Sequence, residues 1–340
     1  MSERIRRLIA LALALVMLLP VLTGCGNTDK TPETTKPAPT EPEEEAKVLK
    51  ILTLGHSLTV DSCHMLNMVA AAEGYEHLLV GTLYYSGCSL ERHVQYLSSD
   101  EPAYNFYLSS TETPTVAPVI TDGVTMKYGL TYEYWDIIIM QGGGMEVAKS
   151  DTYTDGNIQI IQNYVNQHKL NPLAKFAWHM PWALPVDTDL QQTQKTGTVH
   201  QAYAKYDHDR SKYFAAMTKC VSDHIMTDET FEILIPTGTG VENALSSYKT
   251  EKDLHRDYAH GTDFSCLIAA YIYFCSVTGI DHLDEIKVDV VQPQFFRRPN
   301  GMPKWELTED EKALILESVN NALKNPLEMT QSQFTQQPAA

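Results

Sequence analysis

The stretch Lys50-Ile-Leu-Thr-Leu-Gly-His-Ser-Leu-Thr59 places a serine just after a short apolar run. That run is typical of a buried strand, and residues 61–72, Asp-Ser-Cys-His-Met-Leu-Asn-Met-Val-Ala-Ala-Ala, are typical of a helix. Ser57 would then lie on the turn between strand and helix, where its backbone N–H is near a helix N-terminus that favours negative charge. On this stretch alone, simple helix capping by Ser57 or Thr59 is the favoured interpretation.

The composition indicates a globular α/β protein with an ordinary core. The chain has 340 residues, of which 43% are hydrophobic and 20% are charged, enough for one large domain or two small ones. Its net charge of −17 would repel a phosphate backbone, so nucleic acid is not an expected partner. None of the six cysteines belongs to a Cys-x-x-Cys pair, and most are expected to be small buried thiols.

The first 46 residues predict an export signal and a tether rather than folded structure. Three arginines precede an apolar run that is too short for an ordinary membrane-spanning helix. Leu22-Thr-Gly-Cys25 then matches a bacterial lipobox, so we expect a signal peptide over residues 1–24 and lipidation of Cys25; an uncleaved signal anchor is the alternative. Residues 25–46, rich in Pro, Thr and Glu, are expected to be a disordered tether. The acyl chains would hold the protein at the outer face of a membrane, on a bacterial cell surface.

The body of the chain, residues 47–325, alternates predicted strands with predicted helices. Strands are expected at 50–54, 77–85, 135–140, 176–179 and 231–236. Helices are expected at 158–167, within 200–225, at 241–247, 266–274 and 308–323. Residues 104–108 and 124–128 are expected to form an excursive hairpin, and residues 326–340 a disordered tail. This alternation predicts a parallel sheet of about five strands, covered by helices on both faces.

Residues suited to chemistry follow several of these strands. Active sites in parallel sheets lie beyond the carboxyl ends of the strands. Five such ends come before Ser57, Gly87, Gln141, His179 and Thr237. Because four of the five carry residues that can take part in chemistry, we favour a catalytic role for Ser57 over simple capping.

Asp257-Tyr-Ala-His260 supplies the base that a serine nucleophile requires. Asp and His three residues apart on a turn share a face. The carboxylate can therefore hold the imidazole tautomer while the other ring nitrogen accepts the serine proton. Ester hydrolysis also needs donors for the oxyanion, and we expect the N–H of Ser57, the N–H of Gly87 and the side-chain amide of Gln141.

Several of these blocks resemble those of the SGNH (GDSL-type) hydrolases. Gly55-His56-Ser57-Leu58 resembles the opening block, Gly87 the second and Asp257-x-x-His260 the last. The body is most similar to a bacterial branch of unknown function whose second block reads Gly-Cys-Ser-Leu-x-x-His, as residues 87–93 do here. The resemblance implies a flavodoxin-like, three-layer α/β/α fold and serine esterase chemistry without a metal or cofactor.

Two positions depart from that family pattern. His56 stands where Asp or Asn is usual, and it is a candidate substrate-binding residue. The third block of the family, Gly-x-Asn-Asp, has no counterpart after Met140, where Gln141-Gly-Gly-Gly144 stands instead. Gln141 is therefore the expected substitute for the third oxyanion donor.

The polar residues also fit two other kinds of site less well. Residues 143–150 come within one residue of a phosphate loop, but Ala148 replaces the required glycine and Glu146 would point negative charge at phosphates. A metal site is a less favoured alternative for the Asp/His-rich segment made of Asp253, His255, Asp257 and His260. His179 is expected to be a core histidine rather than a pocket residue.

The sequence thus predicts a lipid-anchored extracellular serine esterase. The expected substrate is an acyl ester, with acetyl as the preferred acyl group, on a carbohydrate. Trp178 and Trp182 are candidate platforms for a sugar ring, with core packing as an equal alternative. Two other functions stay open: a carbohydrate-binding surface lipoprotein without useful turnover, and acyl transfer to a glycan.

Overall fold

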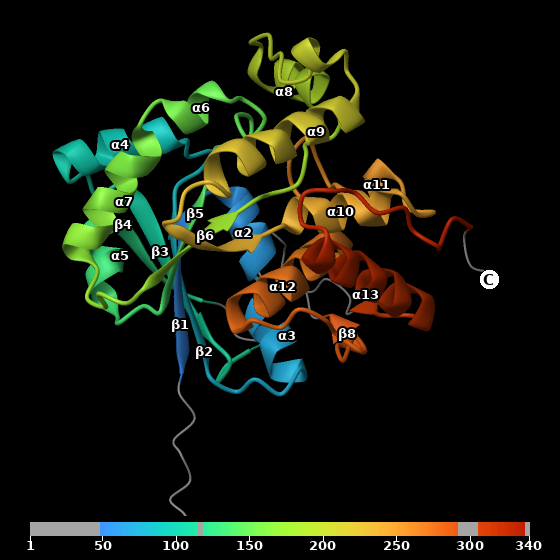
Figure 1. The fold of residues 1–340 in the computed structure, drawn as a ribbon, viewed down its shortest axis with the longest axis horizontal. Helices are drawn as coiled ribbons and strands as arrows, with labels where there is room; N and C mark the ends of the chain where they lie inside the picture. Colours follow the sequence, from blue (N-terminus) through green and yellow to red (C-terminus); the bar gives the residue numbers. More distant parts are fainter. Residues whose placement is uncertain (1–47, 115–117, 292–304, 337–340) are drawn as a thin grey trace, which may run out of the picture. The chain divides into compact units, whose positions relative to one another are not determined.

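The computed structural model describes residues 48–114, 118–291 and 305–336 (Figure 1). The predicted signal peptide, the tether and Cys25 lie outside the described residues. All described residues belong to the unit Ala46–Ala340. Within them, no helix has the length and apolar character needed to cross a membrane.

A seven-stranded sheet with the order β4-β3-β2-β1-β5-β6-β7 forms the centre of the fold. The strands are β1 (Leu49–Gly55), β2 (Leu78–Tyr84), β3 (Tyr104–Ser110), β4 (Val119–Val124), β5 (Ile137–Gln141), β6 (Lys175–His179) and β7 (Phe231–Ile235). Strands β2, β1, β5, β6 and β7 run parallel, whereas β3 and β4 are antiparallel. The sheet is therefore mixed, and the prediction of a purely parallel sheet of about five strands is wrong at this edge.

The antiparallel edge comes from the segment that was expected to form an excursive hairpin. Strand β3 pairs directly with β2, from Leu79↔Ser110 to Tyr84↔Asn105, so the segment joins the main sheet. Residues 124–128 end β4 and begin helix α5 (Met126–Tyr132) instead of forming the second arm. Strand β4 is mostly exposed, and therefore lacks the apolar run that identifies a buried strand in a sequence.

The remaining elements are a small second sheet, two short irregular helical turns and the α-helices. Strands β8 (Val290–Val291) and β9 (Trp305–Glu306) form a separate two-stranded sheet. A short 3-10 helix spans Ala204–Tyr206, and a π-helical turn, Val221–Ile225, extends helix α9. Helices α2 (Ser57–Cys63), α3 (Leu66–Ala72), α4 (Leu90–Ser99), α6 (Asp151–Thr154), α7 (Asn157–His168), α8 (Thr188–Thr196), α9 (Arg210–Cys220), α10 (Thr237–Leu245), α11 (Glu251–Leu254), α12 (Asp263–Thr278) and α13 (Glu309–Lys324) make up the rest.

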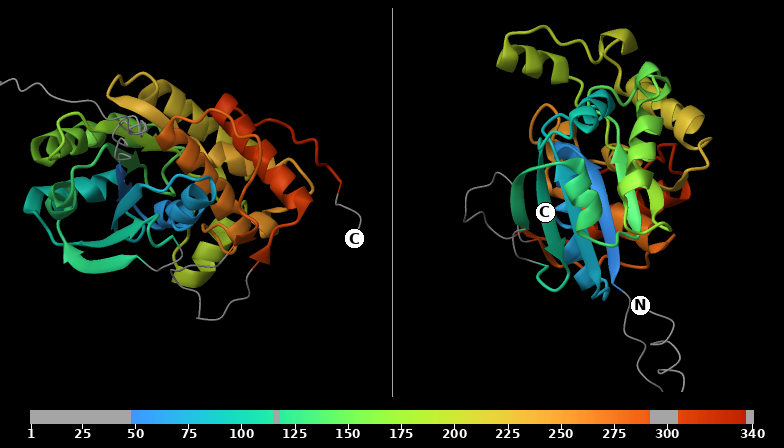
Figure 2. Two further views of the ribbon diagram at one scale, coloured as in Figure 1. Left: turned by 90° about the horizontal axis from the view of Figure 1, so that it is seen from below. Right: turned by 90° about the vertical axis from the view of Figure 1, so that its left-hand side faces the viewer.

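Helices cover both faces of the sheet (Figures 1 and 2). Ile51 of β1 packs with residues of α3, α10, α12 and α13 in one apolar cluster. Its neighbours Leu52 and Leu54 belong to a second cluster with residues of α4, α5, α7 and α9. Side chains alternate between faces along a strand, so strands buried on both faces are apolar throughout. The predicted helix–sheet–helix layering is therefore present.

The two helices at the end of the chain follow the predictions closely. Every residue of α12 from Phe264 to Cys275 is buried, as expected for a helix that is apolar all round. Helix α13 begins with a capping box in which Thr308 accepts a hydrogen bond from the backbone N–H of Glu311.

Residues 326–336 are held in place by hydrogen bonds, although a disordered tail was predicted from residue 326 onward. The N–H of Thr330 donates to Asn243 Oδ1 at 2.7 Å, and the N–H of Tyr248 donates to the carbonyl of Phe334 at 2.8 Å. The prediction is wrong for these residues, because polar groups that composition alone treats as solvated are bonded to α10 and its C-terminal turn. Residues 337–340 lie outside the described part.

Candidate active site

Ser57 is the first residue of α2 and follows β1 at the middle of the sheet. The parallel strands are ordered outward from β1 in both directions, which makes the carboxyl end of β1 the switch point where such sheets bind ligands. Helix α2 begins four residues earlier than predicted, because the N–H of Leu58 donates to His56 Nδ1 at 3.3 Å. Ser57 is partly exposed, and within the described residues its hydroxyl makes no hydrogen bond.

His56 links the turn after β1 to the loop after β5. Its Nε2 lies 3.1 Å from the carbonyl oxygen of Gly142, while its Nδ1 accepts from Leu58. The ring is therefore the neutral tautomer with the proton on Nε2. Burial lowers the pKa of His56 to about 4, so it stays neutral at pH 7. Because the protein itself uses both ring nitrogens, the structure corrects the expectation that His56 binds substrate.

Asp257 and His260 form a hydrogen-bonded pair in the loop between α11 and α12. Both carboxylate oxygens of Asp257 lie 2.9 Å from His260 Nδ1. The same carboxylate accepts from the backbone N–H groups of Ala259 and His260, each at 2.9 Å. Partial burial raises the pKa of Asp257, but these hydrogen bonds outweigh it and hold the pKa well below its ordinary value. Asp257 is therefore ionised at neutral pH and fixes the orientation of the imidazole.

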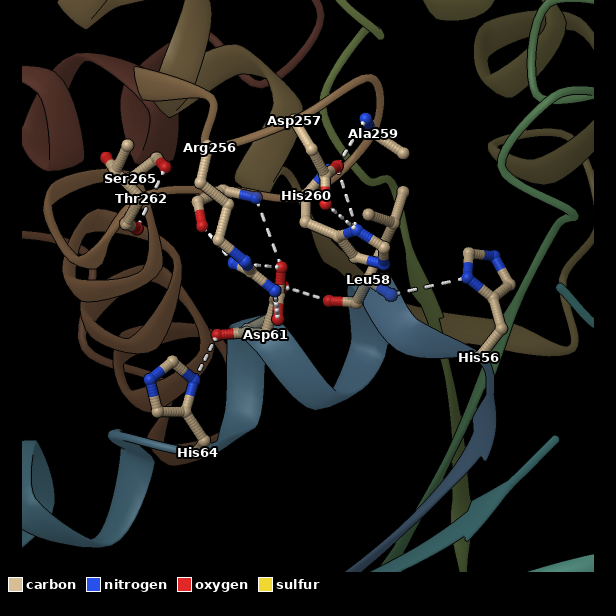
Figure 3. A network of polar contacts seen from close by, with 12 residues as sticks. His56, Leu58, Asp61, His64, Arg256, Asp257, Ala259, His260, Thr262 and Ser265 are labelled. Atoms are coloured by element: carbon tan, nitrogen blue, oxygen red, sulfur yellow. Dashed lines mark hydrogen bonds and ion pairs between the residues drawn. The ribbon is translucent and has the colours of Figure 1, made fainter. Parts of the chain in front are cut away.

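Asp61 fastens this loop to helix α2 (Figure 3). Arg256 donates from Nη1 and Nη2 to the two oxygens of Asp61, at 2.9 and 2.8 Å, and the N–H of Gly261 donates to Asp61 Oδ2 at 3.1 Å. Ser57 and Asp61 are four residues apart on one helix and share a face, and Gly261 directly follows His260. This clamp, Asp61 with Arg256 and Gly261, thus brings His260 to the start of α2, and in Figure 3 the ring points toward Leu58.

The loop is also supported by two residues outside α2. Trp182 Nε1 donates to the carbonyl of Ala259 at 2.9 Å, and Thr188 Oγ1 donates to the carbonyl of Tyr258 at 2.6 Å. Trp182 is 0% exposed and Trp178 is 1% exposed. Neither ring has a free face for a sugar, so of the two equal alternatives the structure shows core packing and not a tryptophan platform, and the Trp182 indole supports the loop.

Two of the expected oxyanion donors have unused N–H groups in the described structure. Gly87 lies in the exposed turn after β2 with φ of 61°, a left-handed conformation that glycine adopts without strain. Gln141 ends β5 and is 2% exposed; its Oε1 accepts from Thr59 Oγ1, and among the described residues its Nε2 has no partner.

The turns after β1, β2 and β5 lie against one another. A Cβ added to Gly143 would lie 3.2 Å from Ser89 Cα, in the segment after β2. A Cβ added to Gly144 would lie 3.4 Å from Leu58 Cδ1, at the start of α2. The glycines at 143 and 144 therefore let the loop after β5 approach the other two turns, which brings the Gln141, Gly87 and Ser57 segments to one end of the sheet.

The remaining singled-out residues lie in the core. His179 is 0% exposed, its Nε2 is 2.8 Å from Thr237 Oγ1, and burial lowers its pKa well below the ordinary value, in line with the expected core histidine. The cysteines of the described part are buried thiols, and burial raises the pKa of Cys63 to about 12. No three His, Cys, Asp or Glu side chains gather as metal ligands anywhere in the described ranges.

The sequence interpretation missed the roles of Asp61 and Arg256. The sequence pattern places Asp61 only in the first turn of a helix and indicates no role for Arg256. The available signal was local: Asp61 lies one helical turn after Ser57, and Arg256 directly precedes Asp257. Nothing in a single sequence shows that two residues 195 positions apart form an ion pair.

The geometry defines an α/β protein with a serine at the switch point of its sheet and an Asp–His pair fastened beside it. A family model described as "Domain of unknown function (DUF4886)" matches residues 50–294, and the chain belongs to this family. A solved DUF4886 family protein from Bacteroides uniformis is 22% identical, with a TM-score of 0.68 over 84% of this chain and 98% of that one. The two proteins therefore share their fold.

Other solved structures are less similar. A protein from Slackia heliotrinireducens, described as a candidate SGNH hydrolase, is 17% identical with a TM-score of 0.41 over 68% of this chain and 99% of that one. A mutant acetyl-xylooligosaccharide esterase from a Geobacillus is 11% identical with a TM-score of 0.39 over 67% and 94%. Similarity at this level says nothing about the substrate of this chain. No curated protein matches the chain in sequence.

Proposed function

We propose that this protein is an SGNH-type serine esterase with Ser57 as nucleophile, His260 as general base and Asp257 as the residue that orients the base. The observation that carries the proposal is the 2.9 Å contact between Asp257 and His260 Nδ1, in a loop fastened to the helix that Ser57 begins. With Nδ1 held by a carboxylate, Nε2 is the nitrogen left to accept a proton from Ser57. The ionised Asp257 would stabilise the imidazolium that then forms.

The reaction proceeds in two steps, acylation of Ser57 and hydrolysis of the acyl-serine. Ser57 Oγ attacks the ester carbonyl carbon as His260 Nε2 takes its proton, and the negative oxygen accepts hydrogen bonds from the N–H groups of Ser57 and Gly87 and from Gln141 Nε2. The C–O bond to the alcohol breaks as His260 returns the proton to the leaving oxygen. Water then attacks the acyl-serine with His260 again as base, which releases the acid and regenerates Ser57.

The proposal includes the substrate class and the location. We take the acyl group to be acetyl, its alcohol to be a carbohydrate, and the protein to be anchored by a lipid on Cys25 at the outer face of a bacterial membrane. The lipobox ending at Cys25 and the Pro/Thr/Glu-rich segment after it support the anchored, exported location. Acyl transfer would use the same acyl-serine, with a glycan hydroxyl in place of water.

A second candidate function is a surface carbohydrate-binding lipoprotein without useful turnover. One observation favours it: in the part of the chain that the structure describes, the Ser57 hydroxyl and His260 Nε2 are not hydrogen bonded. Catalytic hydrogen bonds are often long in substrate-free enzymes and shorten when substrate binds. For that reason we rank catalysis first and binding second.

Hydrolysis of para-nitrophenyl acetate by residues 47–340 separates the two functions. We expect the wild-type protein to turn over, and Ser57→Ala and His260→Ala to lose at least about a thousandfold in kcat/KM, because loss of a triad member removes the nucleophile or its base. Matched controls are Ser98→Ala, on the exposed side of α4, and His282→Ala, whose side chain is 64% exposed. Both controls should retain wild-type rates.

Two results would count against the esterase proposal. One is a wild-type protein as inert as the two variants, although all three are folded by circular dichroism. The other is turnover that survives in both Ser57→Ala and His260→Ala, which would place the activity elsewhere.

A further inference from the structure

An open groove of about 470 Å³ is lined in part by Asp257. Its walls are formed by Gln191, Gln194 and Lys195 of α8 and by Asp257 and Tyr258 of the loop before α12. In Figure 1 strand β1 begins at the bottom of the sheet, and α8 lies at the top, toward the carboxyl end of β1. The groove therefore adjoins the Asp257–His260 pair on the side of the sheet where the proposed chemistry takes place.

Helix α8 is joined to Tyr258 at both of its ends. At the start of the helix, Thr188 Oγ1 donates to the carbonyl oxygen of Tyr258 at 2.6 Å. Near its end, Lys195 Nζ donates to the Tyr258 hydroxyl at 3.2 Å and lies 4.8 Å from the centre of the ring. The Tyr258 ring in turn meets the His260 ring edge-on, with 6.1 Å between the centroids. The groove wall is thus tied directly to the catalytic loop.

The groove is lined by groups that suit a neutral, polyhydroxylated ligand. Each of the two glutamine side chains carries both a donor and an acceptor, which matches the hydroxyl groups of a sugar. The Gln191 side chain donates one N–H to Asp187 Oδ1 at 2.8 Å, and the Gln194 side chain makes no hydrogen bond with the described residues. Lys195 and Asp257 both line the groove, and their opposite charges offset each other, so the groove attracts neither an anion nor a cation overall.

We propose that this groove binds the alcohol part of the ester and that this alcohol is a neutral sugar residue. The proposal rests on the proposed esterase function. His260 hands its proton to the leaving oxygen, so the alcohol must depart on the His260 side of the reacting carbon. The groove begins at Asp257, on the Nδ1 side of the His260 ring, so a sugar that extends from the leaving oxygen past this ring would meet the amides and the phenol of the groove while the acyl group stays on Ser57.

The test compares two acetate esters that differ only in their alcohol, 6-O-acetylglucose and ethyl acetate. Acetate release is followed by pH-stat titration, and the readout is the ratio of the two kcat/KM values. We expect the wild-type protein to prefer the sugar ester. In the double variant Gln191→Ala/Gln194→Ala this ratio should fall about tenfold, because each lost hydrogen bond weakens sugar binding.

A matched control removes two exposed glutamines from another helix. Gln159 and Gln167 lie on α7, both are exposed, and neither lines the groove. The double variant Gln159→Ala/Gln167→Ala should keep the wild-type ratio. A third ester, 9-O-acetyl-N-acetylneuraminic acid, tests whether the groove prefers an uncharged sugar. This anionic sugar ester should be a poorer substrate than the glucose ester.

The outcomes separate this proposal from the esterase proposal. The groove proposal would be wrong if the wild-type protein showed no preference for the sugar ester. It would also be wrong if the groove variant and the control variant changed the ratio equally. Neither result would contradict the esterase proposal. If the protein preferred the ester of the anionic sugar, the proposal that the groove binds a neutral sugar would be wrong. If the wild-type protein hydrolyses neither these esters nor para-nitrophenyl acetate, the proposed function fails and the groove proposal falls with it.

Discussion

The imidazole of His56 makes two contacts that a carboxylate could not make together. It accepts a hydrogen bond from the N–H of Leu58 and donates one to the carbonyl of Gly142. An Asp or Asn, the usual residues at this position in the resembling family, would accept from the helix N-terminus equally well. The departure at His56 therefore preserves the helix cap and adds a link to the loop after β5.

Because His56 is buried and neutral, the free energy of unfolding should depend on pH, and His56 should account for part of that dependence. Its pKa is about 4 in the folded protein, against an ordinary value of 6.5, so the unfolded state binds more protons between these values. The contribution is fully present above pH 6.5 and is lost as the pH falls toward 4. Its slope is at most about 1.4 kcal/mol per pH unit. Urea denaturation at several pH values should show a flatter dependence for His56→Asn than for wild type.

Other buried histidines titrate in the same direction and keep part of the dependence in the variant. Burial lowers the pKa of His93 and of His255 to about 3 in each case. The difference between the two curves therefore isolates His56, since Asn retains an N-cap acceptor. Parallel curves for wild type and His56→Asn would show that His56 is not held neutral by the fold.

At the scale of elements, the clamp of Asp61, Arg256 and Gly261 sets the position of the loop that carries Asp257 and His260 against α2. Its ion pair joins a carboxylate that is 8% exposed to a guanidinium that is 33% exposed, and Nη1 and Nη2 of Arg256 each donate to one carboxylate oxygen. A bidentate arrangement of this kind fixes direction as well as distance. Asp61 contacts no reacting atom in the proposed mechanism, and it is therefore a positioning residue.

We expect Asp61→Asn to lower kcat for para-nitrophenyl acetate about tenfold with little change in KM, because the loop loses its alignment while the binding surface remains. Arg256→Gln should act in the same direction and should also lower the free energy of unfolding by about 1–3 kcal/mol, less than for a fully buried pair because Arg256 is partly exposed. A double-mutant cycle with both changes should show coupling between the two residues.

The control for the clamp is the exposed ion pair between Lys219 and Asp223, whose side chains are 74% and 44% exposed. Asp223→Asn should change neither kcat nor stability measurably, as is usual for surface ion pairs. An unchanged kcat in Asp61→Asn would show that the clamp does not position His260.

At the scale of the whole molecule, the features that were predicted correctly depend on residues close together in sequence. The central strands are apolar because both of their faces are covered, and the contact between Asp257 and His260, whose catalytic role stays a proposal, spans a single turn. The antiparallel edge, β3 and β4, was misassigned because one of its strands is mostly exposed and its pairing with β2 is set by the folded sheet.

The errors and omissions at the site have the same physical origin. Trp178 and Trp182 are apolar rings with one polar atom, and a sequence does not show whether such a ring is buried. His56 and Asp61 have polar side chains whose partners lie far along the chain, at Gly142 and Arg256. The sequence therefore suggests candidate residue types for the site, whereas their hydrogen-bond partners become visible only in the structure.

The most direct test of the central claim is covalent labelling of Ser57 by a fluorophosphonate, followed by intact mass measurement and peptide mapping. An activated serine attacks phosphorus and loses fluoride, so the account predicts one adduct per chain, located on Ser57. Ser57→Ala should carry none, and His260→Ala should label far more slowly. Labelling of a different residue, or equal rates with and without His260, would contradict the assignment of Ser57 as a nucleophile activated by that histidine.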